Sequence, residues 1–428
     1  MRVLLLFICF VITFSAGAQS PADLLRRGHS YMENPWPNKR RPDSALFFYY
    51  RALTLSDSLH DTEGRNQALL TIGSLAISTA DLTKGKAAYF RVIEYYRKTA
   101  DKKREADTWL ALGEAISVSV NKENLPERLQ SLENARSLYQ QTKNTLSETQ
   151  ASLDIAETHL SQDKLDLAEK EAIQVLDSYK KLGYKKLHYT YDLMAEVSKL
   201  KVDLHNELKY RIEAISSMES TGDTAEAAGY YSRIALVYAD LDRYDLSQTW
   251  ILKSMATLRR RRQYEDYYGD LSLLIYDLIK MNRPREAVGY LETAIREVPP
   301  VNLAQWVDAN EMFGNCYAAM KSYAKAEQYY MEMMKDYKVT NFNRDFYPSG
   351  SWMITDFIHY YQVMATFYIS LKQFAKAGPY VTKVLELPQW LRPPHYPLQV
   401  LSDAVPGRLR RRQLYLRHPQ LRAAQTTE

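Results

Sequence analysis

The stretch FGNCYAAMKSYAKAEQYY, residues 313–330, decides the fold. Its small residue Gly314 is followed twelve positions later by a second small residue, Ala326. Tyr330 and Met333 then follow at intervals of four and three residues. Residues at these intervals share one face of a helix, and small residues let two helix axes approach closely. The stretch therefore predicts two amphipathic helices that are joined by a short turn and cross at the small residues.

The same pattern recurs along the chain. Eight pairs of an apolar residue and a small or aliphatic residue follow one another at intervals of 40, 43, 39, 40, 40, 39 and 51 residues. The second members of these pairs are Gly73, Gly113, Ala156, Ala195, Ala235, Ile275, Gly314 and Ala365. A period in this range is typical of a solenoid. A degenerate first unit, with Ala45, Tyr49 and Ala52 in its second helix, brings the prediction to about nine units.

The pattern is irregular at three places. After Gly113, Pro126 and a three-residue insertion are expected to disturb the second helix. After Ala195, the positions that should be small or apolar hold Glu207 and Arg211. An eleven-residue insertion also separates the last two units.

Segments such as 313–317 followed by 323–330 resemble the tetratricopeptide repeat, in its longer variant of about 40 residues per unit. The resemblance covers residues 22–387. It implies an all-α fold in which about nine helix-turn-helix units stack into an α-solenoid, a right-handed superhelix. It also implies that the protein binds a protein or peptide on its concave face, which the first helix of each unit lines.

The composition agrees with long helices. Pro126 is the only proline between Asp43 and Arg283, so few residues in this stretch can interrupt a helix. The 33 tyrosines are interpreted mainly as packing residues with an apolar body and a polar tip. Cys316, the only cysteine outside the N-terminal apolar run, is expected to be a packed or groove-edge thiol without a reactive role.

The two ends of the chain differ from its middle. Residues 1–18, with an apolar run that ends in Ser15-Ala16-Gly17-Ala18, predict a signal peptide that is cleaved near Ala18. The alternative is an uncleaved anchor, but the run is shorter than the roughly 20 residues of a spanning helix. We therefore expect an exported protein, periplasmic or secreted, with a solenoid over residues 19–387. Residues 388–428 are rich in Pro and Arg and predict an irregular tail.

The candidate binding residues lie six and three positions before, and one and four after, each small residue of a first helix. The set predicted to line the concave face is Asp107, Glu114, Glu157, Asp192, Glu196, Tyr276, Asp308, Glu311 and Asn315. Glu114, Glu157 and Glu196 follow the small residue in three successive units, so their carboxylates would form a ladder that favours a basic segment. The alternative is that Glu is there because it forms helices and keeps the surface soluble.

Two arginine clusters, Arg259–Arg262 and the group at Arg408 and Arg410–Arg412, allow peripheral contact with an anionic membrane surface. Arginines near a helix C-terminus also complement the helix dipole, which is the simpler interpretation of the first cluster. Nucleic acid is not expected as a partner of an exported protein.

The sequence contains no recognisable catalytic motif. The eight histidines are scattered, and neither an HExxH nor a GxSxG arrangement occurs. We therefore predict a protein that is not an enzyme and has no cofactor and no metal site. The predicted function is a scaffold for a protein or peptide; the alternative is a stand-alone or truncated sensor region of a histidine kinase or transcriptional regulator.

Overall fold

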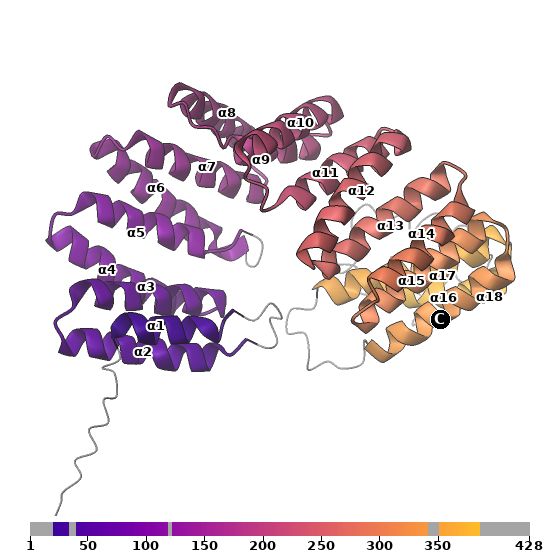
Figure 1. Ribbon diagram of the computed structural model, residues 1–428, viewed down its shortest axis with the longest axis horizontal. Coiled ribbons are helices and arrows are strands. Elements are labelled where there is room, and N and C mark those ends of the chain that lie inside the picture. Colours follow the sequence, from indigo (N-terminus) through magenta and orange to yellow (C-terminus); the bar gives the residue numbers. More distant parts are fainter. Residues whose placement is uncertain (1–19, 34–39, 119–121, 341–350, 386–428) are drawn as a thin grey trace, which may run out of the picture. The chain divides into compact units, whose positions relative to one another are not determined.

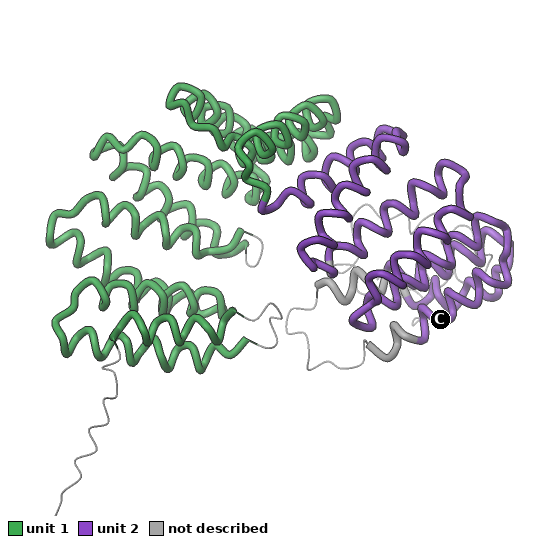
Figure 2. The backbone as a smooth tube through the Cα atoms, in the orientation of Figure 1, with its two compact units in different colours: residues 1–224 green, residues 225–428 purple. Residues whose placement is uncertain are grey.

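The computed structural model describes residues 20–33, 40–118, 122–340 and 351–385. Within these ranges the chain forms 18 α-helices and one short 3-10 helix, with no strand (Figure 1). This confirms the predicted all-α fold. The helices fall into two compact units, residues 1–224 (unit 1) and 225–428 (unit 2), which Figure 2 colours separately.

The helices of unit 1 are α1 (Pro21–Ser30), α2 (Pro42–Ser58), α3 (Thr62–Ser78), α4 (Leu82–Lys98), α5 (Lys102–Ala115), α6 (Leu125–Gln141), α7 (Thr145–Ser161), α8 (Leu165–Lys181), α9 (His188–Leu200) and α10 (Leu204–Thr221). The 3-10 helix Lys122–Asn124 precedes α6. Those of unit 2 are α11 (Ala227–Asp240), α12 (Tyr244–Arg261), α13 (Tyr264–Lys280), α14 (Pro284–Glu297), α15 (Leu303–Ala319), α16 (Tyr323–Thr340), α17 (Ser351–Ser370) and α18 (Phe374–Leu385).

Consecutive helices pack in pairs, from α1 with α2 to α17 with α18. These pairs are the predicted helix-turn-helix units, and there are nine of them in the described ranges. The first helices of neighbouring pairs also contact each other: α3 with α5 and α7 with α9 in unit 1, and α11 with α13 and α13 with α15 in unit 2. The odd-numbered helices are thus the first helices of the sequence pattern.

The turns between helices follow a common design. The residue after the helix C-cap takes a left-handed conformation, as at Ala80 and Ala100, and the next residue caps the following helix. Asp81 and Asp101 are such caps, and the carboxylate of each accepts a hydrogen bond from the backbone N–H three residues later. The cap satisfies an N–H that the new helix leaves without a partner. This is how a turn of three residues can reverse the chain.

The predicted packing code is confirmed at the helix crossings. All eight small or aliphatic residues of the pattern are buried. A Cβ atom added to Gly314 would lie only 2.3 Å from a ring carbon of Tyr330 on α16, the residue expected to fill that gap. The tyrosine therefore fits only because the first helix carries no side chain there.

The irregular units are better ordered than the sequence suggests. Pro126 lies in the first turn of α6, where a missing N–H is harmless, so the expectation that it disturbs the helix is wrong. The three inserted residues are taken up ahead of α6 and shift its register, so that Leu132 fills the space beside Gly113. Arg128 then takes the position of the small residue. The eleven-residue insertion falls around residues 341–350, which lie outside the described ranges.

Cys316 is fully buried on α15, as predicted, and burial raises the pKa of its thiol to about 12. It belongs to a continuous apolar cluster that reaches from α11 to α15 in unit 2. In the described part of the chain, none of the helices combines the length and the apolar character that crossing a membrane requires.

Candidate functional site

All nine candidate residues lie on first helices: α5, α7 and α9 in unit 1, and α13 and α15 in unit 2. Each of them is at least partly accessible. We call these surfaces the first-helix face of unit 1 and the first-helix face of unit 2. The two faces differ in what surrounds the candidates.

On the face of unit 1, Arg128 of α6 is buried and organises the first group. Its guanidinium donates hydrogen bonds to the carbonyl oxygens of Gly113 and Ile116, both at 3.0 Å, so it closes the C-terminal end of α5. It also donates to Glu157 Oε2 at 2.8 Å and lies 4.0 Å from Asp154 Oδ1. The other oxygen of Asp154, Oδ2, is buried and makes no hydrogen bond.

Three carboxyl groups share the field of this single cation. Burial, together with the charges of Glu114 and Glu157, raises the pKa of Asp154 to about 7 despite the nearby Arg128. Partial desolvation also raises the pKa of Glu114, which makes no hydrogen bond in the structure. The group therefore carries more negative charge than its own arginine neutralises.

Arg211 of α10 organises a second group on the same face, with a residue exposure of only 1%. Its guanidinium lies 2.5 Å from Asp192 Oδ1, 2.5 Å from Glu196 Oε1 and 3.5 Å from Glu207 Oε1. Glu207 is buried as well, and desolvation raises its pKa although Arg211 opposes the shift. Three carboxyl groups again surround one guanidinium, and Lys199 adds a second positive charge near Glu207.

These two groups refine the predicted ladder. Glu157 and Glu196 are each held by a buried arginine, whereas Glu114 is the rung without a hydrogen-bonded partner. Sequence reasoning missed the roles of Arg128, Arg211 and Asp154. A signal was present for two of them, because Arg128 and Arg211 break the small or apolar pattern at positions that face a first helix.

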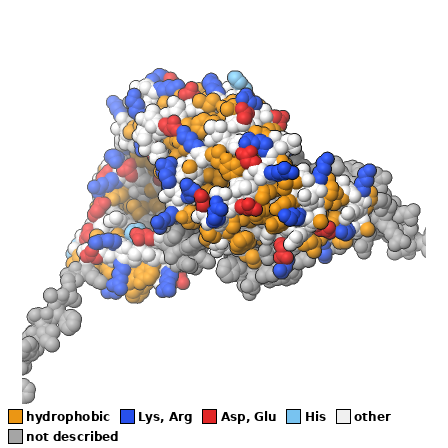
Figure 3. Space-filling view, turned by 45° about the vertical axis from the view of Figure 1, so that its right-hand side comes forward, with side chains coloured by type: hydrophobic (Ala, Val, Ile, Leu, Met, Phe, Trp, Pro, Cys, Tyr) orange, Lys and Arg blue, Asp and Glu red, His pale blue; other side chains and the backbone are white. Residues whose placement is uncertain are grey.

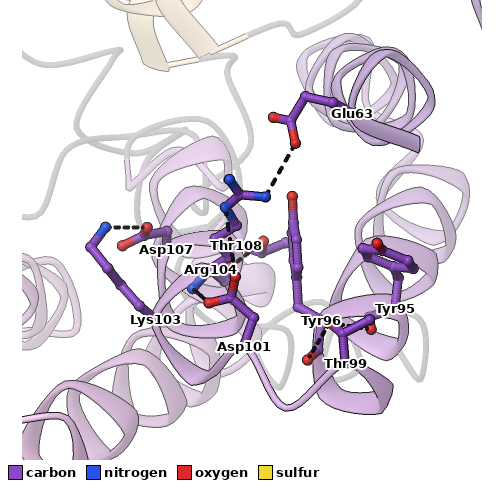
Figure 4. Close-up of polar contacts among 9 residues, drawn as sticks. All are labelled: Glu63, Tyr95, Tyr96, Thr99, Asp101, Lys103, Arg104, Asp107 and Thr108. Atoms are coloured by element: carbon purple, nitrogen blue, oxygen red, sulfur yellow. Dashed lines mark hydrogen bonds and ion pairs between the residues drawn. The ribbon is translucent and has the colours of Figure 1, made fainter. Parts of the chain in front are cut away.

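Asp107, on α5, is occupied by neighbours within unit 1. It accepts a hydrogen bond from the hydroxyl of Tyr139 at 2.8 Å and pairs with Lys103 at 2.8 Å. Figure 4 shows Lys103 reaching Asp107, with Arg104 on the same helix directed toward Glu63 of α3. The N-terminal half of α5 therefore carries several surface ion pairs, and Asp107 is already paired with Lys103 and Tyr139.

The three candidates of α15, in unit 2, are joined to tyrosines and a histidine. Asp308 accepts a hydrogen bond from Tyr360 at 2.8 Å, and Asn315 accepts one from Tyr330 at 2.7 Å. Glu311 lies 2.9 Å from His359 Nε2. The exposed imidazole of His359, on α17, therefore has a carboxylate partner.

The remaining candidate, Tyr276 of α13, is 48% exposed. Lys280 lies over its ring at 5.1 Å, and the ring of Tyr244 meets it edge-on. Leu236 holds the equivalent position on α11 and is 45% exposed. Where unit 1 carries Glu114, Glu157 and Glu196, unit 2 thus carries apolar or neutral side chains.

The first arginine cluster, Arg259–Arg262, makes contacts within unit 2. Arg259 pairs with Glu297, Arg261 donates to the carbonyl oxygen of Ala225, and Arg262 adopts the left-handed conformation that ends α12. These contacts favour the simpler interpretation, in which the arginines complete a helix C-terminus. The second cluster, at residues 408–412, lies outside the described ranges. Figure 3 shows both signs of charge mixed with hydrophobic side chains over the visible face.

Within the described ranges, no group of three or more His, Cys, Asp or Glu residues is placed so that it could hold a metal ion.

No protein-family model matches the chain, and no curated protein matches it. Several solved structures do match the chain in fold. A signal-transduction ATPase with a tetratricopeptide repeat sensor, from Pyrococcus horikoshii, is 13% identical over 76% of this chain and 55% of its own length, with a TM-score of 0.50. This chain thus matches about half of that protein.

Two further structures are more distant in TM-score. Aspartyl phosphate phosphatase F from Bacillus subtilis is 12% identical over 89% of this chain and 97% of its own, with a TM-score of 0.46. A Rap conjugation gene regulator of the plasmid pLS20, solved with a peptide, is 14% identical over 76% of this chain and 99% of its own, with a TM-score of 0.45. The repeat pattern, the nine helix pairs and the first of these likenesses agree: the chain is a tetratricopeptide-like α-helical repeat protein.

Proposed function

We propose that this protein is an exported, non-enzymatic scaffold that binds an extended, basic segment of another protein on the first-helix face of unit 1. The observation that carries the proposal is the surplus of carboxyl groups around Arg128 and Arg211. Arg128 lies among three carboxyl groups and Arg211 among three others, with Lys199 as a second cation near Glu207, so carboxyl groups outnumber cations in both groups. A Lys or Arg side chain of a partner would complete the neutralisation.

The buried arginines also give the face rigidity. Arg128 binds two carbonyl oxygens of α5 and a carboxylate of α7, so it fixes one first helix against the next. Arg211 likewise holds Asp192 and Glu196, which lie one turn apart on α9. A surface that is held in place before binding loses less entropy when a flexible segment is ordered on it.

The experiment is a titration of the full chain with a fluorescent eight-residue peptide of alternating Lys and Ser, at 50 and 300 mM salt. We expect saturable binding that weakens at the higher salt, because exposed charges are screened. Glu114→Gln should weaken binding several-fold and leave the melting temperature unchanged, since Glu114 makes no hydrogen bond in the structure. Glu157 and Glu196 are less suitable, because each accepts a hydrogen bond from a buried arginine and its removal would also change the pairing of that arginine.

The matched control is Glu94→Gln on α4, a second helix. Glu94 is exposed and pairs only with Lys98 on its own helix, so the variant has the same charge change away from the proposed face. Equal loss of affinity in both variants would show that only net charge matters. Undiminished affinity in Glu114→Gln, or tighter binding of the corresponding Glu-Ser peptide, would sink the proposal.

Export is part of the proposal and has its own test. The N-terminal apolar run and the small residues before Ala18 support it, and the first described helix begins just beyond, at Pro21, with Ser20 as its cap. Expression with the native N-terminus in a bacterial host, followed by fractionation and N-terminal sequencing, should yield a chain that starts at Gln19 outside the cytoplasm. A full-length chain that stays in the cytoplasm would refute export.

A further inference from the structure

Two buried carboxyl groups of unit 2 take no part in the proposed binding face. Asp270 and Asp277 lie on α13, seven residues apart and therefore on the same side of that helix. Asp270 is 8% exposed and Asp277 is fully buried. Ionised carboxylates are rarely buried without a cation or several donors, because desolvation of the charge costs a large free energy.

Asp270 meets hydroxyl groups only. Ser232 of α11 lies 2.7 Å from Asp270 Oδ1, Ser254 of α12 lies 2.9 Å from Ser232, and Ser254 also lies 2.9 Å from the carbonyl oxygen of Ala228. Asp270 Oδ2 is buried without a hydrogen bond. The number of hydrogens decides which form this chain of groups suits.

Each serine hydroxyl has a single hydrogen, and Ser232 Oγ also lies 3.0 Å from the carbonyl oxygen of Ala228. Two hydroxyl hydrogens are therefore shared between the Asp270 carboxyl and that carbonyl oxygen. A protonated Asp270 adds a third hydrogen and carries no charge, whereas an ionised Asp270 leaves Oδ2 as a buried charged oxygen without a donor.

Asp277 meets even fewer polar groups. Ser247 of α12, itself fully buried at the small-residue position, is the hydroxyl that faces it. Neither the two carboxyl oxygens of Asp277 nor the hydroxyl oxygen of Ser247 makes a hydrogen bond of ordinary geometry. A protonated carboxyl can donate to Ser247 after a small adjustment, whereas a carboxylate in this place would remain a nearly unsolvated charge.

The helices packed around α13 supply no compensating cation to these two carboxyls among the described residues. On α11 and α12, Arg233 and Lys253 lie over the rings of Tyr230 and Tyr231. Within α13, Asp266 adds a like charge that raises the pKa of Asp270, and Tyr244 of α12 is the titratable group near Asp277. Neither α14 nor α15 adds a described charged group.

We propose that the contacts of α13 with α11 and α12 form a proton-dependent seam, closed when Asp270 and Asp277 are protonated and loosened when they ionise. Burial raises the pKa of each carboxyl to about 6 from the ordinary 3.8. Because the folded pKa is the higher one, this stabilisation is complete below about pH 4 and is lost as the pH rises through about 6. Mild acid thus tightens the helix that presents Tyr276 on the first-helix face of unit 2.

The test is hydrogen–deuterium exchange of the full chain at pH 5 and pH 8, corrected for intrinsic exchange rates. Each carboxyl should shift the local opening equilibrium by about tenfold between these pH values, so α12 and α13 should lose protection of roughly tenfold to a hundredfold at pH 8. Asp270→Asn/Asp277→Asn should remove this pH dependence and increase protection at pH 8. Asp245→Asn, an exposed carboxyl on α12, is the control and should behave as the wild type.

Equal protection of α12 and α13 at both pH values in the wild type would overturn the proposal, and this comparison needs no variant. A double Asn variant that keeps the full pH dependence would also overturn it. If the double variant does not fold, the single variants should each remove about half of the effect on a logarithmic scale. Retention of the whole effect in both single variants would contradict the assignment.

Discussion

Units 1 and 2 both contain buried charged side chains, but among the described residues only unit 1 buries arginines. In unit 1 the buried charges include the guanidinium groups of Arg128 and Arg211, each paired with carboxyl groups of which several reach the surface. In unit 2 they are the carboxyl groups of Asp270 and Asp277, which meet only serine hydroxyls. A guanidinium cannot lose its proton in a protein, so it must be paired; a carboxyl can become neutral instead.

This difference has a consequence for the two surfaces. Pairing an arginine with more than one carboxylate brings acidic residues to the first-helix face of unit 1, where they can meet a cation. A neutral carboxyl needs no charged partner. The positions of unit 2 that correspond to Glu114, Glu157 and Glu196, such as Leu236 and Tyr276, can therefore be apolar or neutral. The departures from the repeat pattern therefore determine the chemistry of the faces, while the regular positions determine the fold.

The largest expected effect comes from removing the cation of the second group in unit 1. Arg211→Leu should lower the free energy of unfolding by about 3–5 kcal/mol, because buried Glu207 is left without its partner. Urea denaturation followed by circular dichroism would measure the loss. An effect below about 1 kcal/mol would show that the Arg211 group is not a buried ion network.

The double variant Glu207→Ala/Arg211→Leu sharpens the same test. It copies the residues of α14, where Ala287 and Leu291 occupy the equivalent buried positions. The variant removes both buried members of the ion group and leaves the more exposed Asp192 and Glu196. Replacing a buried ion pair by apolar side chains is often neutral or stabilising, so the double variant should recover most of the loss. A double variant as unstable as the single one would mean that the helix register assigned to α10 is wrong.

A smaller effect is expected where the repeat of unit 2 is regular. Gly314→Ala should lower the free energy of unfolding by about 1–3 kcal/mol, because the new methyl group meets the buried ring of Tyr330. Gly289→Ala on α14 is the matched control, since its new methyl group meets nothing within 4 Å. The control should gain about 0.5–1 kcal/mol from better helix propensity. Equal changes in both variants would contradict the packing code.

The next prediction concerns the pH dependence of peptide binding to unit 1. A bound cation near Asp154 would lower the pKa of that carboxyl from about 7, so binding releases a proton and becomes tighter as the pH rises. If the shift is about one unit, the affinity for the Lys-Ser peptide should rise up to about tenfold from pH 6 to pH 8. Fluorescence titrations at both pH values measure this ratio. Asp154→Asn should flatten it, and an affinity that falls with rising pH would be the opposite of this expectation.

The sequence was sufficient for the parts of the molecule that repeat. The spacing from Gly314 to Ala326 and Tyr330 is a steric rule, and the same rule, which holds at six of the eight places, predicts those helix pairs and their buried positions. Pro126 was misjudged because a proline in a helical segment is harmful only beyond its first turn. Pro126 lies in the first turn only because the three inserted residues precede α6. The spacing of the repeat does not show on which side of the helix start these residues fall.

The candidate site was harder to predict because it depends on long-range pairing. The positions of Glu114, Glu157 and Glu196 on one face follow from helical periodicity. Their environments do not, since Arg128 reaches Glu157 from a different helix, 29 residues away in the sequence. Arg211 reaches Glu196 across the pair α9 and α10 in the same way. A charged residue at a position that should be small is the signal for such a partner, but it does not say which residue the partner is.

The smallest expected effect concerns the turn that leads into α10, the helix that carries Glu207 and Arg211. Val202 adopts a φ of 59° there, a left-handed conformation that is strained for a β-branched residue, whereas Gly183 and Gly222 occupy such positions at other turns of unit 1. Its side chain is largely exposed, so little packing is lost on its removal. Val202→Gly should therefore raise the free energy of unfolding by about 1 kcal/mol, since relief of strain outweighs the added flexibility of the unfolded chain. Ala80→Gly, at an equivalent turn without a branched side chain, should gain less in the same urea denaturation measurement. If Val202→Gly instead weakens the protein, the conformation of this turn does not limit the stability of α10.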